Sequence, residues 1–139
     1  MQIVNCKLQI VICEFMPNVK TKELIERVKK FIIRIISLVN KFPKTIAAYR
    51  ISGQLIDAVC STGANLTEAQ AARSRKEFVS IIGVVLKECK EVIFWLDIVS
   101  SIKFLTRKED LEELVALIKE GKELANIFGR IIITTSKSL

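Results

Sequence analysis

The residues that could support catalysis or metal binding are few, and their spacing does not match the arrangements that such chemistry requires. The chain has no histidine, which removes the commonest general base and metal ligand. Neither GxxxxGK[ST] nor GxGxxG, the glycine patterns that bind phosphate groups, occurs. Glu88, Glu91 and Asp97 could form a carboxylate site, but Lys87 and Lys90 flank the first two and favour a solvated helix face. The sequence predicts no catalytic residue, no metal site and no cofactor, so we expect that the protein is not an enzyme.

The cysteines do not form a metal-binding pattern either. Cys6, Cys13, Cys60 and Cys89 include no CxxC pair, whereas a zinc site built from thiolates alone needs two close pairs. Cys60 and Cys89 fall on apolar faces of expected helices. We therefore expect buried free thiols, as in proteins of the reducing cytoplasm.

The charge of the chain is strongly asymmetric. Residues 1–77 contain 13 lysines and arginines against 6 acidic residues, while residues 78–139 contain 9 of each, so the net charge of +7 belongs to the first half. Such an excess favours an anionic partner, namely RNA, DNA or an acidic protein. The alternative is that the charge only keeps a very apolar small protein in solution.

The basic residues fall in three places. Three lie where the second and third expected helices meet, two lie at the preceding turn, and the others lie along the first two helices. We expect these side chains to bind nucleic acid: Lys30, Arg34, Lys41, Lys44, Arg50, Arg73, Arg75 and Lys76. No aromatic residue is interleaved with them, so the pattern supports attraction to the phosphate backbone but not base stacking.

Composition and periodicity predict the elements that position these residues. Half of the residues are apolar, and glycine (5) and proline (2) are scarce, which favours long helices with few turns. Apolar residues recur at steps of three and four over 20–40, 45–71, 74–101 and 107–133. Short connections, one of them around Pro43, make neighbouring helices antiparallel. The sequence predicts an all-α fold, an antiparallel up-down-up-down four-helix bundle.

The periodicity also predicts which faces are buried. In the first helix we expect a core stripe of Leu24, Val28, Phe31, Ile35 and Leu38. In the last helix we expect the stripe Leu111, Leu114, Ile118, Gly121, Ala125, Phe128 and Ile132, widened by Leu117, Leu124 and Ile131. The first helix has a second apolar stripe, Ile25, Ile32, Ile36 and Val39. One bundle cannot easily bury both stripes of this helix, so we expect the second to face another subunit.

Several polar residues are expected to serve the structure. Ser74 and Glu77 have the spacing of a capping box and predict the start of the third helix, and Thr106 and Glu109 repeat that spacing before the fourth. Gly53 and Gly63 indicate a close backbone approach, or a bend near Gly63.

Asn65 and Glu68 form a further polar pair near this expected bend. They could satisfy loosened backbone groups or meet Arg73. A binding role for Asn65, Glu68, Ser74 and Glu77 is the alternative.

The two ends of the chain are outside this pattern. We interpret residues 1–17 as a peripheral or poorly ordered extension and residues 18–139 as the bundle domain. The apolar run over residues 2–15 is too short and polar to cross a membrane and lacks the features of a signal peptide. Asn18 or Thr21 can cap the first helix, and Thr134 to Leu139 are expected to fray.

The middle of the chain resembles a bacterial family of four-helix bundle proteins related to the 23S rRNA intervening-sequence proteins. The resemblance lies in KFPK, SGQL, STGANLTEAQAARSRKEF, VLKE and FWLDIV, which begin at residues 41, 52, 61, 85 and 94. Its most specific part is Ser61-Thr62-Gly63-Ala64-Asn65, then Glu68-Ala69, Arg73-Ser74 and Glu77-Phe78.

This resemblance implies a non-enzymatic protein that assembles as a ring-like homopentamer. Five copies would carry about +35, a strong attractor for polyanions. The accessory proteins of diversity-generating retroelements are structurally similar and bind a reverse transcriptase. Only the analogy of fold extends this role to the present chain. We therefore expect a homo-oligomeric scaffold that binds RNA or a ribonucleoprotein. The alternatives are a protein-interaction module and a reverse-transcriptase accessory protein.

Overall fold

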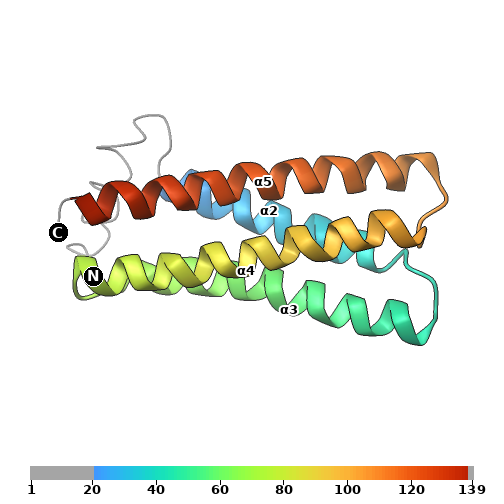
Figure 1. Cartoon of the computed structure of the whole chain (residues 1–139), viewed down its shortest axis with the longest axis horizontal. Coiled ribbons are helices and arrows are strands. Elements are labelled where there is room, and N and C mark those ends of the chain that lie inside the picture. Colours follow the sequence, from blue (N-terminus) through green and yellow to red (C-terminus); the bar gives the residue numbers. More distant parts are fainter. Residues whose placement is uncertain (1–20, 138–139) are drawn as a thin grey trace.

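The computed structural model describes residues 21–137, and these form a bundle of four helices. They are α2 (Thr21–Val39), α3 (Ile46–Ala69), α4 (Arg75–Ile102) and α5 (Lys108–Lys137). Each helix runs opposite to the one before it, so the bundle is up-down-up-down (Figure 1). The helices pack in a closed cycle in which α2 contacts α3 and α5, and α4 contacts the same two from the other side. The predicted fold class is confirmed.

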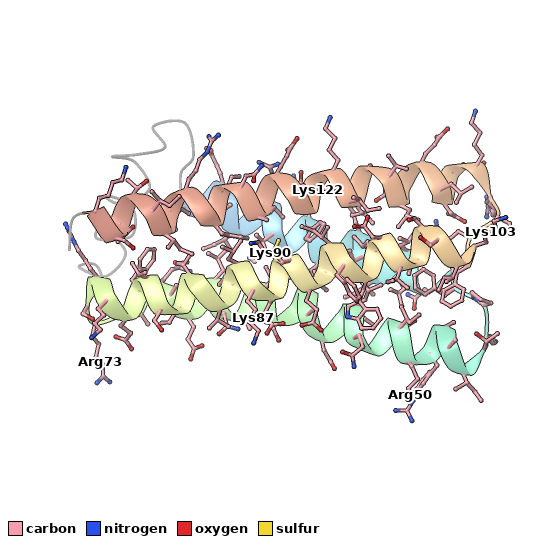
Figure 2. All side chains as sticks on the ribbon, in the orientation of Figure 1. Arg50, Arg73, Lys87, Lys90, Lys103 and Lys122 are labelled. Atoms are coloured by element: carbon pink, nitrogen blue, oxygen red, sulfur yellow. The ribbon has the colours of Figure 1, made fainter. Side chains whose placement is uncertain are left out.

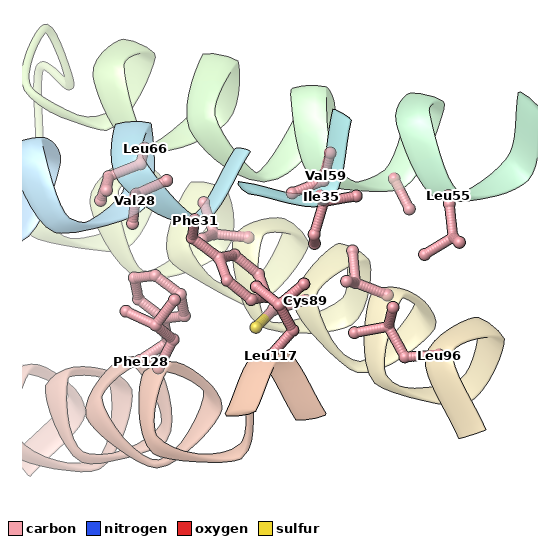
Figure 3. Packing of buried hydrophobic residues seen from close by; sticks show 14 of the residues in the cluster. Val28, Phe31, Ile35, Leu55, Val59, Leu66, Cys89, Leu96, Leu117 and Phe128 are labelled. Atoms are coloured by element: carbon pink, nitrogen blue, oxygen red, sulfur yellow. The ribbon is translucent and has the colours of Figure 1, made fainter. Parts of the chain in front are cut away.

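The core runs along the axis of the bundle, because each helix turns one apolar face inward. All of the residues of the predicted α2 stripe are buried. Around Phe31 the core contains side chains from all four helices, among them Val59, Cys89 and Leu117 (Figure 3). The largest fully buried side chains are Phe31, Phe128, Leu24, Ile35, Leu38, Leu55, Leu66, Ile82, Leu96, Leu114 and Leu117.

Glycine allows close packing at two positions in this core. A Cβ atom on Gly63 would lie 2.6 Å from Cδ1 of Ile32, so the Ile32 side chain of α2 occupies the space that an alanine methyl group would need on α3. A Cβ atom on Gly121 would lie 2.9 Å from Cγ1 of Ile93 on α4. At Gly63 the close approach is made by the Ile32 side chain and not by backbone, and at Gly53, which has no atom within 4 Å, the prediction of a close approach is wrong.

Polar caps fix the helix boundaries. The hydroxyl of Thr45 accepts a hydrogen bond from the Ala48 backbone N–H and starts α3. Helix α4 ends at Ile102, and its C-cap residue Lys103 has left-handed backbone angles (φ 53°, ψ 43°). Thr106 lies one residue too early to cap α5, because the first α5 backbone bond runs from Leu111 N–H to the carbonyl of Arg107.

Helix α5 differs from the prediction in its length and in its buried face. It continues to Lys137, and Thr135 is buried with its hydroxyl donating to the Ile131 carbonyl, so the tail does not fray at residue 134. Leu111 is 42% exposed, while the unpredicted Ile127 is buried. The buried face of α5 is therefore shifted around the helix relative to the predicted stripe.

The second apolar stripe of α2 is largely absorbed by the bundle itself. Val39 is buried, and Ile25 and Ile32 pack against the core from the side of α3. Ile36 remains 37% exposed, and Ile33, which the predicted stripe did not include, is 62% exposed. We expected that one bundle cannot easily bury both stripes and that the second faces another subunit. For Val39 this expectation is wrong, because the bundle itself buries this residue. The interpretation of residues 1–17 as an extension, and Asn18 as a cap, lies outside the described residues.

Candidate nucleic-acid interface

A row of ion pairs joins α2 to α5. Arg27, Arg34 and Lys41 recur every seven residues and so lie on one side of α2 or at its end, facing acidic residues of α5. Arg34 makes two hydrogen bonds to the carboxylate of Glu113, with nitrogen–oxygen distances of 2.7 and 3.2 Å. Lys41 Nζ lies 2.6 Å from Oδ1 of Asp110, whose side chain is only 5% exposed. These three cations are therefore neutralised within the molecule.

The most extensive of these contacts is at Arg27. Its guanidinium makes a paired contact with the carboxylate of Glu120, at 2.6 and 2.8 Å, and a third bond to Glu123 at 2.6 Å. The hydrogen bonds raise the pKa of Arg27 and lower the pKa of Glu120. The hydrogen bond to Glu113 likewise raises the pKa of Arg34.

These ion pairs occupy two residues of the nucleic-acid interface that the sequence predicts. Arg34 and Lys41 were expected to contact nucleic acid, but in this structure their charges meet acidic side chains of α5. The same heptad spacing that places Arg27, Arg34 and Lys41 together is visible in the sequence, as is the matching pair Glu113 and Glu120. The sequence did not predict the ion pairs, because the spacing of residues within one helix does not show which other helix lies opposite them.

The remaining predicted basic residues are exposed. Lys30 lies on the outer side of α2, and Lys44 and Arg50 lie at the end of the bundle where α2 connects to α3. Arg73, Arg75 and Lys76 lie at the opposite end. Figure 2 shows Arg50 and Arg73 projecting from α3 and from the α3–α4 turn near the two ends of the rod. The basic residues of the two turns therefore lie at opposite ends of the bundle.

The α3–α4 turn holds its basic residues through backbone contacts. The hydroxyl of Ser74 accepts from the Glu77 N–H at 3.1 Å, and Oε2 of Glu77 accepts from the Arg73 N–H at 2.6 Å. Glu77 thus reaches one residue beyond the usual capping-box partner. The capping role predicted for Ser74 and Glu77 is confirmed, and it orders the backbone that presents Arg73, Arg75 and Lys76.

Asn65 and Glu68, which precede this turn, differ in their contacts. The side-chain amide of Asn65 donates to the carbonyl of Ser61 at 2.8 Å, which confirms the expected backbone role. Glu68 is exposed, and its side chain has no hydrogen bond or ion pair among the described residues, including to Arg73. The predicted contact between Glu68 and Arg73 is therefore wrong in this structure.

A surface groove lies beside the α2–α3 connection and includes two of the predicted basic residues. We call it the Tyr49 groove; it is lined by Val39, Phe42, Pro43, Lys44, Thr45, Ile46, Ala48, Tyr49, Arg50 and Ser52. Tyr49 is 80% exposed and Ile46 is 85% exposed. The expectation that no aromatic residue accompanies the basic residues is wrong here, because Tyr49 shares the groove with Lys44 and Arg50. The adjacent Tyr49-Arg50 pair in the sequence could have indicated this.

Within the described residues, Cys60, Cys89 and the three carboxylates of α4 form no joint site. Cys89 is buried in the core and its pKa is raised to about 12 by burial, whereas Cys60 is exposed, contrary to prediction, because it lies on the rim between α3 and α2. Glu91 accepts a hydrogen bond from the Trp95 indole N–H at 3.3 Å. Across the described part of the chain, no group of three or more cysteine and acidic side chains could hold a metal ion. Within residues 21–137, no helix is both long and apolar enough to cross a membrane.

Comparison with known proteins agrees with this fold. No functionally curated protein matches the chain in sequence. A crystal structure of a protein of unknown function from the S23 ribosomal protein family of Bacteroides thetaiotaomicron is similar, with a TM-score of 0.69 and 26% sequence identity. The match covers 78% of this chain and 97% of that one. Residues 20–126 match the profile described as 23S rRNA-intervening sequence protein, and the chain therefore belongs to this family.

Proposed function

We propose that the protein is a non-catalytic, homo-oligomeric helical scaffold that binds RNA or a ribonucleoprotein through contacts to phosphate groups. The observation that carries the proposal is the division of its basic residues into two sets. Arg27, Arg34 and Lys41 are neutralised by α5, while Lys44, Arg50, Arg73 and Lys76 are exposed and make no ion pair among the described residues. Charges that the fold leaves without internal partners are available to an external polyanion.

Lys44 and Arg50 lie where α2 connects to α3, and Arg73 and Lys76 lie where α3 connects to α4. Among the described residues, the side chains of Lys44, Arg50, Arg73 and Lys76 make no ion pair with an acidic side chain. The cap orders the backbone at Arg73 and at the start of α4, where Lys76 lies, and it does not occupy the charge of either side chain. A phosphate bound there therefore costs less loss of backbone freedom than one bound by a flexible loop.

Assembly into an oligomer would strengthen this attraction. Large apolar side chains remain exposed on the outer faces of the helices, and they include Ile33 at 62%, Phe94 at 55% and Val115 at 67%. Such side chains favour contact with further protein surfaces. A ring repeats each basic end in every copy, and several weak phosphate contacts then act together on one RNA.

The same apolar side chains favour a second candidate function. A protein-interaction module would use Ile33 and Phe94 to dock a different protein, which includes a reverse transcriptase. This candidate needs no nucleic acid, so the effect of basic-residue variants on RNA binding separates it from the first.

The test compares two double variants that remove the same charge. R73Q/K76Q removes two cations from the α3–α4 end, and K90Q/K122Q removes two exposed lysines from the middle of the rod (Figure 2). RNA affinity is measured by fluorescence anisotropy with labelled RNA at 0.1 M salt. We expect R73Q/K76Q to weaken binding about tenfold or more and K90Q/K122Q to have a much smaller effect. Equal effects of the two variants, or no RNA binding by the unmodified protein, would contradict the proposal.

A further inference from the structure

The Tyr49 groove has a composition that differs from the rest of the surface. It has a volume of about 650 Å³, which lies within the range of pockets that bind small organic groups. Its lining contains two cations, Lys44 and Arg50, and no acidic residue. The ring of Tyr49 and the side chain of Ile46 are more exposed than any other large apolar groups among the described residues.

These features match the chemistry of an unpaired nucleotide. A nucleobase has a flat π-face that stacks on exposed aromatic rings, and its phosphate is attracted to lysine and arginine. Tyr49 directly precedes Arg50 in the chain and follows Lys44 by five residues, and all three line the groove. Hydroxyl groups in the lining, those of Thr45 and Ser52, are already bonded to the α3 backbone and add little recognition.

We propose that the Tyr49 groove binds an unpaired nucleotide of RNA, with the base stacked on Tyr49 and the two phosphates that flank it bound by Lys44 and Arg50. This inference rests on the proposed RNA-binding function and adds to it a preference for single-stranded regions. Bases in a duplex are stacked on each other, so their faces are not available to a protein side chain. Among the described residues, no exposed aromatic side chain of this kind lies at the α3–α4 end, which would bind phosphates of either form.

The experiment uses the full chain and two fluorescein-labelled RNAs of ten nucleotides, oligo(A) and a duplex of mixed sequence. Two variants are compared: Y49A removes the ring and Y49F keeps it. We expect Y49A to weaken oligo(A) binding roughly 5- to 100-fold, while Y49F binds as the unmodified protein does. Duplex affinity should change less than twofold in both.

Salt dependence supplies a second readout. Y49A should leave the slope of log affinity against log salt unchanged, because a stacked base releases no counterion. K44Q/R50Q should reduce that slope for oligo(A) by about 1.4, that is about 0.7 for each lost phosphate contact.

Other outcomes overturn the inference in distinguishable ways. If RNA binding is weakened by R73Q/K76Q but Y49A binds oligo(A) as tightly as the unmodified protein, the groove is not a nucleotide site and the proposed function stands. If Y49A changes the molar mass measured by light scattering, the groove is covered by a second copy of the chain. If the unmodified protein binds neither RNA, the proposed function and this inference both fail.

Discussion

The contact between Gly63 and Ile32 allows the packing of α2 on α3 to be tested quantitatively. An alanine Cβ at position 63 would lie 2.6 Å from Cδ1 of Ile32, whereas carbon atoms normally pack at about 3.5–4.0 Å. The Cδ1 atom must therefore move by about 1 Å for the alanine to fit. It lies at the far end of a partly buried side chain, so this movement is local.

The expected effect of G63A is a balance of two terms. Replacing glycine by alanine inside a helix stabilises it by about 1 kcal/mol. Inserting a methyl group into a filled contact costs about 1–3 kcal/mol. We expect G63A to lower the free energy of unfolding by about 0–2 kcal/mol. The control is G53A, where the new methyl group meets no atom within 4 Å, and which should raise the free energy of unfolding by up to about 1 kcal/mol.

A double-mutant cycle isolates the contact itself. Valine lacks Cδ1, so I32V removes the atom that an alanine at position 63 would meet. Alone, I32V should cost about 0.5–1.5 kcal/mol. In G63A/I32V the new methyl group fills the vacated space, and we expect the double variant to be about 1 kcal/mol more stable than the sum of the single effects predicts.

The assay is urea unfolding followed by circular dichroism at one fixed protein concentration, since any self-association would make the midpoint depend on concentration. Two results would refute the reasoning. The first is additivity of G63A and I32V within about 0.3 kcal/mol. The second is a stabilisation by G63A as large as that by G53A.

Three further predictions concern single residues. Lys103 has left-handed backbone angles, so K103G should raise the free energy of unfolding by about 1 kcal/mol in urea titrations, and a loss of stability would be inconsistent with this cap. The pKa of Glu120 is lowered in the folded state, so its pairing with Arg27 stabilises the fold above the unfolded pKa of about 4.3, and this contribution is lost as the pH falls through the folded pKa. E120Q should therefore lower the free energy of unfolding at pH 7 by about 0.5–1 kcal/mol, a difference that shrinks as the pH falls below about 4; a difference independent of pH would count against the pair. Iodoacetamide at pH 8 should label Cys60 and leave Cys89 unmodified in the folded protein, because the Cys89 thiol is buried with a pKa of about 12; peptide mass spectrometry showing equal labelling would contradict this.

Most of the fold follows from features local to each helix. The boundaries of α2, α3 and α4 agree with prediction within two residues, because apolar steps of three and four and the Ser74 cap define them. The end of α5 was missed because Thr134 and Thr135 read as polar tail residues. In the structure their hydroxyls bond to carbonyls one turn earlier, and Thr135 is buried.

The candidate site depends on relations between helices, which one sequence does not display. Arg34 and Lys41 look like the other basic residues until α5 brings Glu113 and Asp110 opposite them. Cys60 follows the buried Val59 directly, and its exposure depends on how far α2 extends over α3. The Tyr49 groove requires the α2–α3 connection to place Lys44 beside the first turns of α3.

The central claim, that RNA phosphates bind the cations left unpaired by α5, is tested most directly by the salt dependence of RNA affinity. Single-stranded RNA is titrated with the unmodified protein from 0.05 to about 0.3 M salt, and the logarithm of affinity is plotted against that of salt concentration. Contacts from Lys44, Arg50, Arg73 and Lys76 predict a slope of about −3 per protomer, at about 0.7 for each phosphate. A slope near zero, or no measurable binding at the lowest salt, would contradict the account.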